Sequence, residues 1–322
     1  MMSHTVLLTG ASGFVGKAVL DGLLARDYSV VAALRNVPAG LDPRVTVSRF
    51  EALDEATDWS AALVGVRTVI HSAARVHVMN DTEVDPLAAF RKVNVDGTLN
   101  LARQAVRAGV TRFVFVSSIK VNGEGTLKGR PYHADDTPAP ADPYGVSKME
   151  AEQALRALAL ETGIEVVIVR PVLVYGPGVK ANFLAMMRWL DKGVPLPFGA
   201  IDNRRSLVAL GNLSDLVLTC VTHPAAANQT FLVSDGEDLS TTGLLRRMAA
   251  ALDKRARLLP VPSSLLELGA TLLGKRSLSQ RLCGSLQVDI EKTRTVLGWK
   301  PPISVDEALR LAARGYQEKT SK

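Results

Sequence analysis

Two side chains in the segment DPYGVSK are spaced for acid–base chemistry: Tyr144 and Lys148, four residues apart. Asp142 is a good helix N-cap and Pro143 suits the first helical position, so we expect a helix with the phenol and the ammonium on one face. A phenol has a pKa of about 10 in water, and a fixed positive charge beside it should bring that pKa towards working pH. The same spacing arises by chance in many helices, so taken alone it favours an ordinary helix face.

Two serines, Ser117 and Ser118, close the apolar run RFVFVSS that precedes this helix. A hydroxyl at the end of a buried strand could hydrogen-bond a substrate oxygen and stabilise charge that develops there. Otherwise a serine in that position is simply a turn residue, so the pair gains meaning only if the strand and the helix meet.

A glycine-rich turn, TGASGFVG, lies between the first expected strand and the first expected helix. Gly10 would allow the tight turn, Gly13 would let the backbone approach a pyrophosphate, and Gly16 would let the helix pack close to the strand. The N-terminus of that helix then offers N–H groups to phosphates. Glycine turns are common, but the order strand, turn, helix favours a dinucleotide site.

The end of the second strand indicates which dinucleotide. It reads Ala33, Leu34, Arg35, Asn36, with Leu34 in the place of the carboxylate that usually holds the ribose hydroxyls of NAD. A guanidinium there suits the 2′-phosphate of NADP. NADP(H) is therefore favoured, and NAD(H) is the alternative, with Arg35 stacked on adenine or solvated.

The hydrophobic pattern predicts the elements that must position these residues. Short β-branched runs predict strands at 4–10, 28–35, 44–47, 67–71, 112–118 and 164–170. A helical spacing follows the first strand, and a helical stretch is expected before each of the last four. Strands buried on both faces that alternate with helices predict an α/β fold with a doubly wound parallel sheet.

The rhythm breaks after residue 170, where four prolines interrupt it: Pro171, Pro177, Pro195 and Pro197. We therefore place a first domain at 1–174 and a smaller lobe mainly at 175–322, with 206–224 returning to the first domain as a helix. Ser304 and Glu307 form a capping box that opens a last helix. The tail 318–322 is expected to be frayed.

Composition limits the classes of function. The 322 residues are 47% hydrophobic and 22% charged, enough to bury a sizeable core. The net charge of +6 is spread along the chain, which argues against nucleic acid and suits an anionic small molecule. Cys220 and Cys283 cannot build a disulfide framework or a four-cysteine zinc site, so no metal is expected. The lack of a signal peptide or an apolar run of ~20 residues predicts a soluble cytoplasmic protein without membrane insertion.

Seven motifs occur in one order along nearly the whole chain: TGASGFVG, HSAA (71–74), NVDGT (94–98), VSS (116–118), YGVSK (144–148), RPVLVYGPG (170–178) and LGWKPP (297–302). Together they resemble the extended short-chain dehydrogenases/reductases, the nucleotide-sugar epimerase/dehydratase/reductase family. The resemblance implies a Rossmann domain that binds NAD(P) and a C-terminal lobe that holds a nucleoside-diphosphate sugar.

The resemblance also implies roles for single residues. Ser118 matches the active-site serine, Tyr144 the acid/base, and Lys148 the residue on the nicotinamide ribose. The positions implied for the cofactor are Gly10, Ser12, Gly13, Phe14, Val15, Gly16, Arg35, His71, Ala73, Ala74, Asn94, Ser117, Tyr144, Lys148 and Pro171. Asn94 matches the helical asparagine near the active site. His71 and His77 are more often structural histidines, and neither is expected to act as a catalyst.

In the lobe, the resemblance implies a site for a UDP-sugar that Ser118 also contacts. Asn182 would contact the diphosphate, Phe198 would stack on uracil, and Arg205 or its neighbour Arg204 would lie near the diphosphate, with Arg281 as a weaker candidate. The ordinary alternatives are a helix cap for the asparagine, a core aromatic for the phenylalanine and surface charges for the arginines. Asp289 and Lys292 are similar to fold-stabilising residues.

Departures from the family pattern limit which of the family's reactions the chain is expected to catalyse. The 4,6-dehydratases carry Asp-Glu after the active-site Ser/Thr, because removal of water needs a second acid and base. Ile119 and Lys120 stand there instead, which argues against a dehydratase. The 4-epimerases usually show Val-Tyr-Gly next, whereas this chain has 121–123 as Val-Asn-Gly. Leu173 or Val174 replaces the asparagine common after Arg-Pro.

The strings AARVHVMND, SSIKVNGE and GVKANF, with RRSLVAL and GSLQVDI, closely resemble bacterial UDP-2-acetamido-2,6-dideoxyhexos-4-ulose reductases. The chain is therefore expected to reduce a C4 ketone to UDP-N-acetylquinovosamine, or to run the reverse dehydrogenation, for O-antigen or other surface polysaccharide. A 4-epimerase of UDP-glucose or UDP-N-acetylglucosamine is the alternative, and a non-catalytic NAD(P)-binding regulator is a third reading. Family members often pair through helices near the catalytic one, so a homodimer is a candidate assembly.

Overall fold

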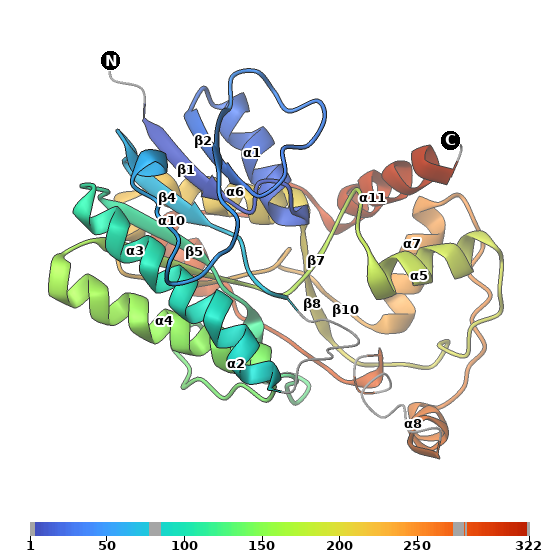
Figure 1. Cartoon of the computed structure of the whole chain (residues 1–322). Helices are drawn as coiled ribbons and strands as arrows, with labels where there is room; N and C mark the ends of the chain where they lie inside the picture. The colour runs from blue at the N-terminus through green and yellow to red at the C-terminus, as the bar shows by residue number, and fades with distance from the viewer. Residues whose placement is uncertain (1–3, 77–84, 273–279, 281, 321–322) are drawn as a thin grey trace.

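The computed structural model describes residues 4–76, 85–272, 280 and 282–320 (Figure 1). A seven-stranded parallel sheet has the order β3-β2-β1-β4-β5-β6-β9. Its strands are β1 (Thr5–Thr9), β2 (Ser29–Leu34), β3 (Thr46–Arg49), β4 (Thr68–His71), β5 (Arg112–Val116), β6 (Glu165–Pro171) and β9 (Thr230–Val233). The first six have the doubly wound order of a Rossmann fold, which confirms the predicted fold class.

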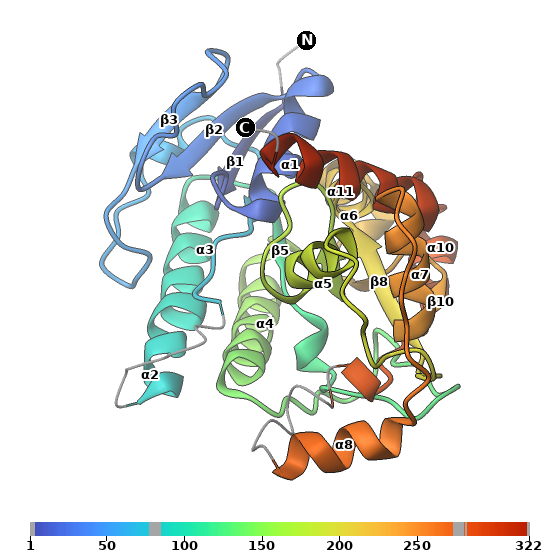
Figure 2. The same ribbon diagram turned by 90° about the vertical axis from the view of Figure 1, so that its right-hand side faces the viewer.

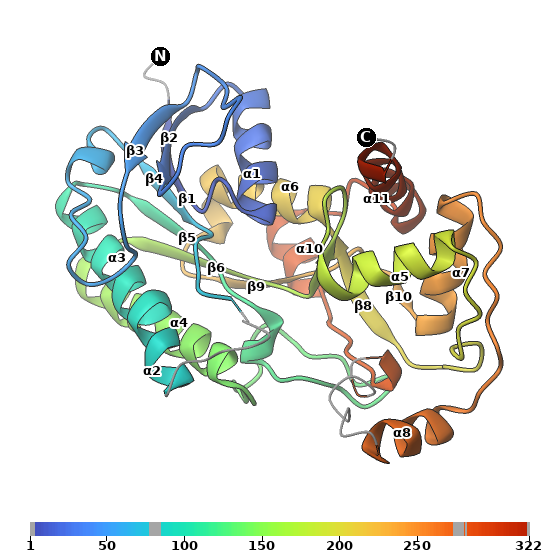
Figure 3. The same ribbon diagram turned by 45° about the vertical axis from the view of Figure 1, so that its right-hand side comes forward.

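Helices cover both faces of the sheet (Figures 1 and 3). One layer contains α1 (Phe14–Ala25) and α6 (Leu210–Thr222), and the other contains α3 (Gly97–Arg107) and α4 (Pro143–Thr162). Alternate residues of β1 point into the two layers: Val6 and Leu8 pack towards α1 and α6, and Leu7 packs towards α3 and α4. All three are fully buried, which is why this strand reads as a continuous apolar run.

The return of the chain to the first half begins as a strand. The stretch predicted as one helix from residue 206 contains β8 (Arg205–Ala209), which pairs with β7 (Leu173–Tyr175) and β10 (Asp238–Leu239) in a second, three-stranded sheet. The helix begins only at residue 210, because the run Ser206–Ala209 is buried, with Ser206 paired with β10 and Leu207–Ala209 paired with β7.

Helix α6 then packs closely on α1. A Cβ at Gly22 would lie 2.5 Å from the Leu218 side chain, and the Ser214 hydroxyl donates to the Ala18 carbonyl at 3.0 Å. Cys220 is buried on α6 as a free thiol, which agrees with its interpretation as a small apolar residue, whereas Cys283 is only half-buried.

A third apolar core lies beyond the small sheet, among α5 (Ala181–Asp191), α7 (Thr241–Ala251) and α11 (Val305–Thr320). Helix α8 (Ser263–Leu272) projects at the edge of this region (Figure 2), and α10 (Glu291–Leu297) packs near β9. The Glu307 amide donates to the Ser304 hydroxyl at 3.3 Å, as the capping box predicts. Helix α11 extends to Thr320, and the fraying expected at 318–322 stays a prediction.

Three further expectations need correction. Strand β3 follows β2 without an intervening helix, and β4 is preceded only by a 3₁₀ turn, η1 (Ala61–Leu63). Strand β9 was not predicted, although its four residues are buried and pair in parallel with β6. Residues 230–233 therefore complete the large sheet, while the predicted division at residue 174 stays a proposal. Among the described helices, none is long and apolar enough to cross a membrane.

Candidate active site

The glycine turn lies where the order of strands reverses, between the carboxyl ends of β1 and β4. Gly10 has φ +73°, and a Cβ there would lie 2.8 Å from the Ala73 nitrogen and from the Ser72 hydroxyl. A Cβ at Gly16 would lie 2.0 Å from the Gly10 carbonyl oxygen. The turn thus needs glycine at both positions, for the reasons that the spacing predicted.

The glycine turn exposes backbone at the start of α1. Ser12 and Gly13 are exposed, and Phe14 and Val15 are half-buried at the start of α1. Gly13 precedes the helix as its N-cap. The exposed, side-chain-poor backbone at a helix N-terminus fits a pyrophosphate. These residues stay proposed cofactor contacts.

A cavity of about 910 Å³ adjoins the carboxyl ends of β2, β3 and β4. Arg35, Ala73 and Ala74 line it, as expected for cofactor-binding positions. Leu34, however, is 2% exposed and belongs to the core. Leu34 is the last residue of β2, and its correspondence to the position of a ribose-binding carboxylate stays a prediction.

Two acidic residues in the same cavity wall were missed by the sequence analysis. Glu51 and Asp54 follow the carboxyl end of β3. Asp54 caps its own turn by accepting from the Ala56 amide at 3.1 Å and from the Thr57 hydroxyl at 3.0 Å. Glu51 is exposed. The wall thus carries carboxylates, which suit ribose hydroxyls, beside the guanidinium of Arg35, which suits a phosphate. The sequence signal for Glu51 and Asp54 was their position directly after a parallel strand.

The predicted helix and strand bring the acid–base residues together. Asp142 accepts from the Gly145 amide at 2.7 Å, so α4 begins as expected. Tyr144 follows in the first turn of the helix, and Ser118 is the side chain that favours its ionised form. Lys148, one turn along α4, donates to the Val116 carbonyl at 2.8 Å. Its ammonium also lies 4.1 Å from the centre of the Phe115 ring.

Burial governs the ionisation of this pair. Burial raises the pKa of Tyr144 to about 12, the Ser118 hydrogen bond opposes that rise, and the Asp142 carboxylate adds to it. Burial lowers the pKa of Lys148 to about 7, and the negative charge of Glu152 opposes that fall. The Lys148 ammonium is held at the Val116 carbonyl, and the expectation that it brings the phenol towards working pH stays a prediction.

Asn94 ties the loop after β4 to α4. It lies in a π-helical turn, η2 (Lys92–Asp96), between α2 (Pro86–Arg91) and α3. Its side-chain oxygen accepts from the Arg75 amide at 2.8 Å, and its nitrogen donates to the Arg75 carbonyl and the Ser147 hydroxyl, both at 3.0 Å. Such π turns are frequent at functional sites. The amide acts here by fixing backbone near the site.

His71 is a core residue. Its two ring nitrogens are hydrogen-bonded to the hydroxyls of Thr9 at 2.8 Å and Thr98 at 3.0 Å. Burial, with Lys148 nearby, lowers its pKa to about 3. The structural interpretation is thus confirmed, and a cofactor contact through the His71 side chain is ruled out because both nitrogens are engaged. His77 lies outside the described residues.

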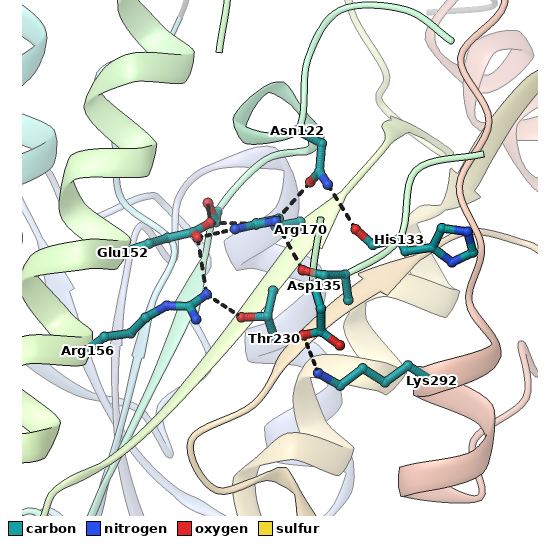
Figure 4. Close-up of polar contacts among 10 residues, drawn as sticks. Asn122, His133, Asp135, Glu152, Arg156, Arg170, Thr230 and Lys292 are labelled. Carbon is teal, nitrogen blue, oxygen red and sulfur yellow. Dashed lines mark hydrogen bonds and ion pairs between the residues drawn. The ribbon is translucent and has the colours of Figure 1, made fainter. Parts of the chain in front are cut away.

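Arg170 and Glu152 form a buried ion pair (Figure 4). Arg170 donates to both carboxylate oxygens of Glu152, at 2.9 and 2.5 Å, and to the Asn122 side-chain oxygen at 2.9 Å. The Ser117 hydroxyl donates to the same carboxylate at 2.6 Å. Ser117 therefore serves this network, and its expected cofactor contact is wrong for the side chain. Glu152, four residues after Lys148 on one helix, was the sequence signal for this network.

The expected sugar-nucleotide residues lie on separate segments of the lobe. Asn182 is exposed in the first turn of α5, and Phe198 is half-buried against the lobe core. Arg205 donates to the Gly284 carbonyl at 3.0 Å, and Arg204 is exposed. Arg281 lies outside the described residues. The substrate roles of these residues stay proposals.

Three more expected residues lie near the sheet. Pro171 is buried at the end of β6, and its cofactor contact stays a proposal. Lys292 pairs with Asp135 at 2.7 Å (Figure 4), and Asp289 accepts from the Glu291 amide at 2.6 Å, which agrees with their fold-stabilising interpretation.

Known proteins are similar to this chain in sequence and in fold. Residues 6–234 match the NAD dependent epimerase/dehydratase family. A Vibrio cholerae protein named UDP-glucose 4-epimerase is 49% identical over 325 residues, covering 100% of this chain and 98% of its own. The fold matches the structure of the UDP-glucose 4-epimerase of Thermotoga maritima with UDP-glucose, at a TM-score of 0.75 and 24% identity, over 99% of this chain and 100% of that one. It also matches the UDP-glucuronic acid 4-epimerase of Bacillus cereus with NAD, at a TM-score of 0.78 and 20% identity, over 98% of this chain and 99% of that one.

Proposed function

Because this chain belongs to the NAD dependent epimerase/dehydratase family, we propose that it is a UDP-hexose 4-epimerase that uses an NAD(P) cofactor. The observation that carries the proposal is the 49% identity to the Vibrio cholerae protein named UDP-glucose 4-epimerase, over nearly the full length of both chains. The site is compatible with it, because Ser118, Tyr144 and Lys148 come together where β5 ends and α4 begins, and the glycine turn has no space for a Cβ at Gly10 or Gly16. The 4-reductase favoured by the sequence becomes the second candidate.

In the proposed reaction, the Tyr144 oxygen exchanges a proton with the C4 oxygen of the sugar, and the Ser118 hydroxyl hydrogen-bonds the same oxygen. A bound nicotinamide supplies the hydride acceptor and donor. Tyr144 has a pKa of about 12 in the polypeptide, which suits it to give a proton to the 4-keto sugar. Taking a proton from the C4 hydroxyl requires a lower pKa, which a positive charge nearer the phenol would provide.

Lys148 would orient the nicotinamide ribose, and the glycine turn would bind the pyrophosphate through backbone N–H groups. Asn94 and the buried Glu152–Arg170 pair hold the loops after β4 and β5 in place around these groups. An epimerase must then present both faces of the keto sugar to the same hydride. It therefore needs a lobe that lets the sugar rotate while the nucleotide stays bound.

The second candidate is a 4-reductase of a UDP-4-keto-6-deoxy-N-acetylhexosamine. The observation that favours it is Arg35 in the wall of the cofactor cavity, since a guanidinium suits NADPH, an exchangeable reductant. Glu51 in the same wall weighs against it by suiting the ribose hydroxyls of NAD. Ile119 and Lys120 carry no carboxylate, so we expect neither candidate to show 4,6-dehydratase activity.

The two candidates separate in one panel of reactions. UDP-glucose and UDP-N-acetylglucosamine are incubated with the purified protein without added cofactor, and the 4-epimers are measured by NMR. A parallel reaction contains NADPH and a UDP-4-keto-6-deoxy-N-acetylhexosamine, and absorbance at 340 nm is followed. Epimer formation without NADPH consumption supports the proposal. NADPH oxidation without epimer formation assigns the reductase, and Tyr144→Phe should abolish whichever activity is found.

The proposed setting follows from the sequence expectations. A cytoplasmic enzyme that modifies a UDP-sugar would supply glycosyltransferases that build O-antigen or another surface polysaccharide. A homodimer is the proposed assembly, and sedimentation equilibrium of the purified protein tests it directly. A monomer at micromolar concentration would contradict it.

A further inference from the structure

A lysine bridges the two segments that carry the reacting hydroxyls. Lys120 lies in the 3₁₀ turn η3 (Ile119–Val121), which begins directly after Ser118, and its amide donates to the Ser118 hydroxyl at 3.3 Å. Its ammonium pairs with the carboxylate of Asp142 and with Glu124 at 3.0 Å. The side chain is 26% exposed, so these pairs are only partly screened by water.

Asp142 is the N-cap of the helix that carries Tyr144. One of its oxygens accepts from the Gly145 amide at 2.7 Å, and the other meets Lys120. The backbones also touch, because a Cβ at Gly145 would lie 2.8 Å from the Lys120 carbonyl oxygen. The η3 turn and the first turn of α4 are therefore joined by an ion pair, a cap and a backbone contact.

The same carboxylate acts on the phenol. Asp142 disfavours the ionised form of Tyr144, whereas the hydrogen bond with Ser118 favours it. Polar or aromatic groups near the phenol or the Lys120 ammonium come from four segments. Ser118 and Glu124 lie at η3, and Asp142 and Lys148 lie at the start of α4. Phe90 lies on α2, and the guanidinium of Arg75 lies over the Phe90 ring. A positive charge paired with the Asp142 carboxylate must weaken the effect of that carboxylate on the ionisation of the phenol.

We propose that Lys120 is a positioning residue of this site: it holds the turn of Ser118 against the N-terminus of the Tyr144 helix and neutralises Asp142 beside the phenol. Its ammonium is engaged by two carboxylates, which fixes the side chain between the η3 turn and α4. The effect on turnover rests on the proposed function, whereas the effect on Tyr144 itself does not.

The direct test is the titration of Tyr144 in the full chain. The protein is labelled with 3-fluorotyrosine, and the resonance of residue 144 among the five tyrosines is assigned by Tyr144→Phe. The titration midpoint is followed by ¹⁹F NMR in wild type, Lys120→Met, Lys120→Arg and Asp142→Asn. Asparagine keeps the helix cap while it removes the charge. Lys128→Met, at an exposed lysine paired with Asp202, is the control.

We expect Lys120→Met to raise the midpoint by about half to one pH unit and Lys120→Arg to restore it. Asp142→Asn should lower the midpoint, and the Lys120→Met/Asp142→Asn double variant should match Asp142→Asn, since the carboxylate that Lys120 neutralises is gone. In turnover, Lys120→Met should lower kcat about three- to tenfold with a smaller change in KM, and arginine should rescue it.

An unmoved midpoint in Lys120→Met, or the same shift in Lys120→Arg, overturns the proposal. If Lys120→Met does not fold, the Asp142→Asn titration still decides, because a midpoint that stays or rises there contradicts the role of the carboxylate. The titration contains no substrate. If no UDP-sugar is converted, the proposed function fails, while a shifted midpoint still supports the role of Lys120.

Discussion

Replacing Lys148 by methionine should stabilise the folded chain while it removes activity. In the folded state the Lys148 side chain is 2% exposed, and burial lowers its pKa from 10.5 to about 7. In the unfolded chain the ammonium stays charged up to about pH 10.5. The unfolded chain therefore binds the Lys148 proton more tightly than the folded chain does, and this difference lowers the free energy of unfolding. Methionine keeps the volume of the lysine stem without its charge.

The sign and size of the effect follow from linkage. The penalty is fully present below about pH 7, falls by about 1.4 kcal/mol for each pH unit above it, and vanishes above the unfolded pKa. The difference in unfolding free energy between Lys148→Met and wild type should thus be largest at pH 6 and about 3 kcal/mol smaller at pH 9.

Urea denaturation followed by circular dichroism at pH 6, 7, 8 and 9 measures this difference. Lys128→Met serves as the matched control, because Lys128 is half exposed and pairs with an exposed Asp202, so its difference should not vary with pH. A Lys148→Met difference that is the same at pH 6 and pH 9 would refute the reasoning, because Lys148 would then keep its charge in the folded chain.

Three further variants test other parts of the site. Tyr144→Phe should leave cofactor affinity nearly intact and lower kcat by about 10²–10⁴, and near-normal kcat would remove the phenol from the mechanism. Arg35→Asp should shift the ratio of NADP to NAD affinity by about ten- to a hundredfold towards NAD, as loss of a 1–3 kcal/mol charge-assisted contact implies, and an unmoved ratio in fluorescence titrations would show that Arg35 does not select the cofactor. Arg170→Met should cost about 3–5 kcal/mol in urea denaturation, because it leaves the Glu152 carboxylate buried without its partner, and a loss under 1 kcal/mol would contradict the buried pair.

The parts of the site that depend on backbone geometry could be predicted from the sequence. Gly10 and Gly16 lie where a Cβ would collide with the chain, so their residue type reports the turn itself. The Asp142 cap and Pro143 likewise predicted where α4 begins. The helix cap and the Gly16 contact are local, whereas the space at Gly10 is limited by Ser72 and Ala73, about sixty residues later in the chain.

What failed depends on contacts between distant segments. Ser117 by itself did not indicate that its hydroxyl would donate to Glu152 on another element, although the spacing of Glu152 from Lys148 was a signal for the network. Strand β9 has only four residues, and its burial against β6 comes from a pairing partner about sixty residues earlier in the chain. The Tyr144 pKa followed burial rather than the spacing of Lys148.

The 4-epimerase proposal is tested most directly by the fate of the hydrogen at C4. UDP-glucose deuterated at C4 is incubated with the purified protein without added cofactor, and the C4 position of any UDP-galactose is read by NMR and mass spectrometry. An epimerase of the proposed kind returns the same hydride, so deuterium should be retained at C4 of the product with no net consumption of NAD(P)H. Absence of a 4-epimer from both UDP-glucose and UDP-N-acetylglucosamine, or a product with hydrogen at C4, would contradict it.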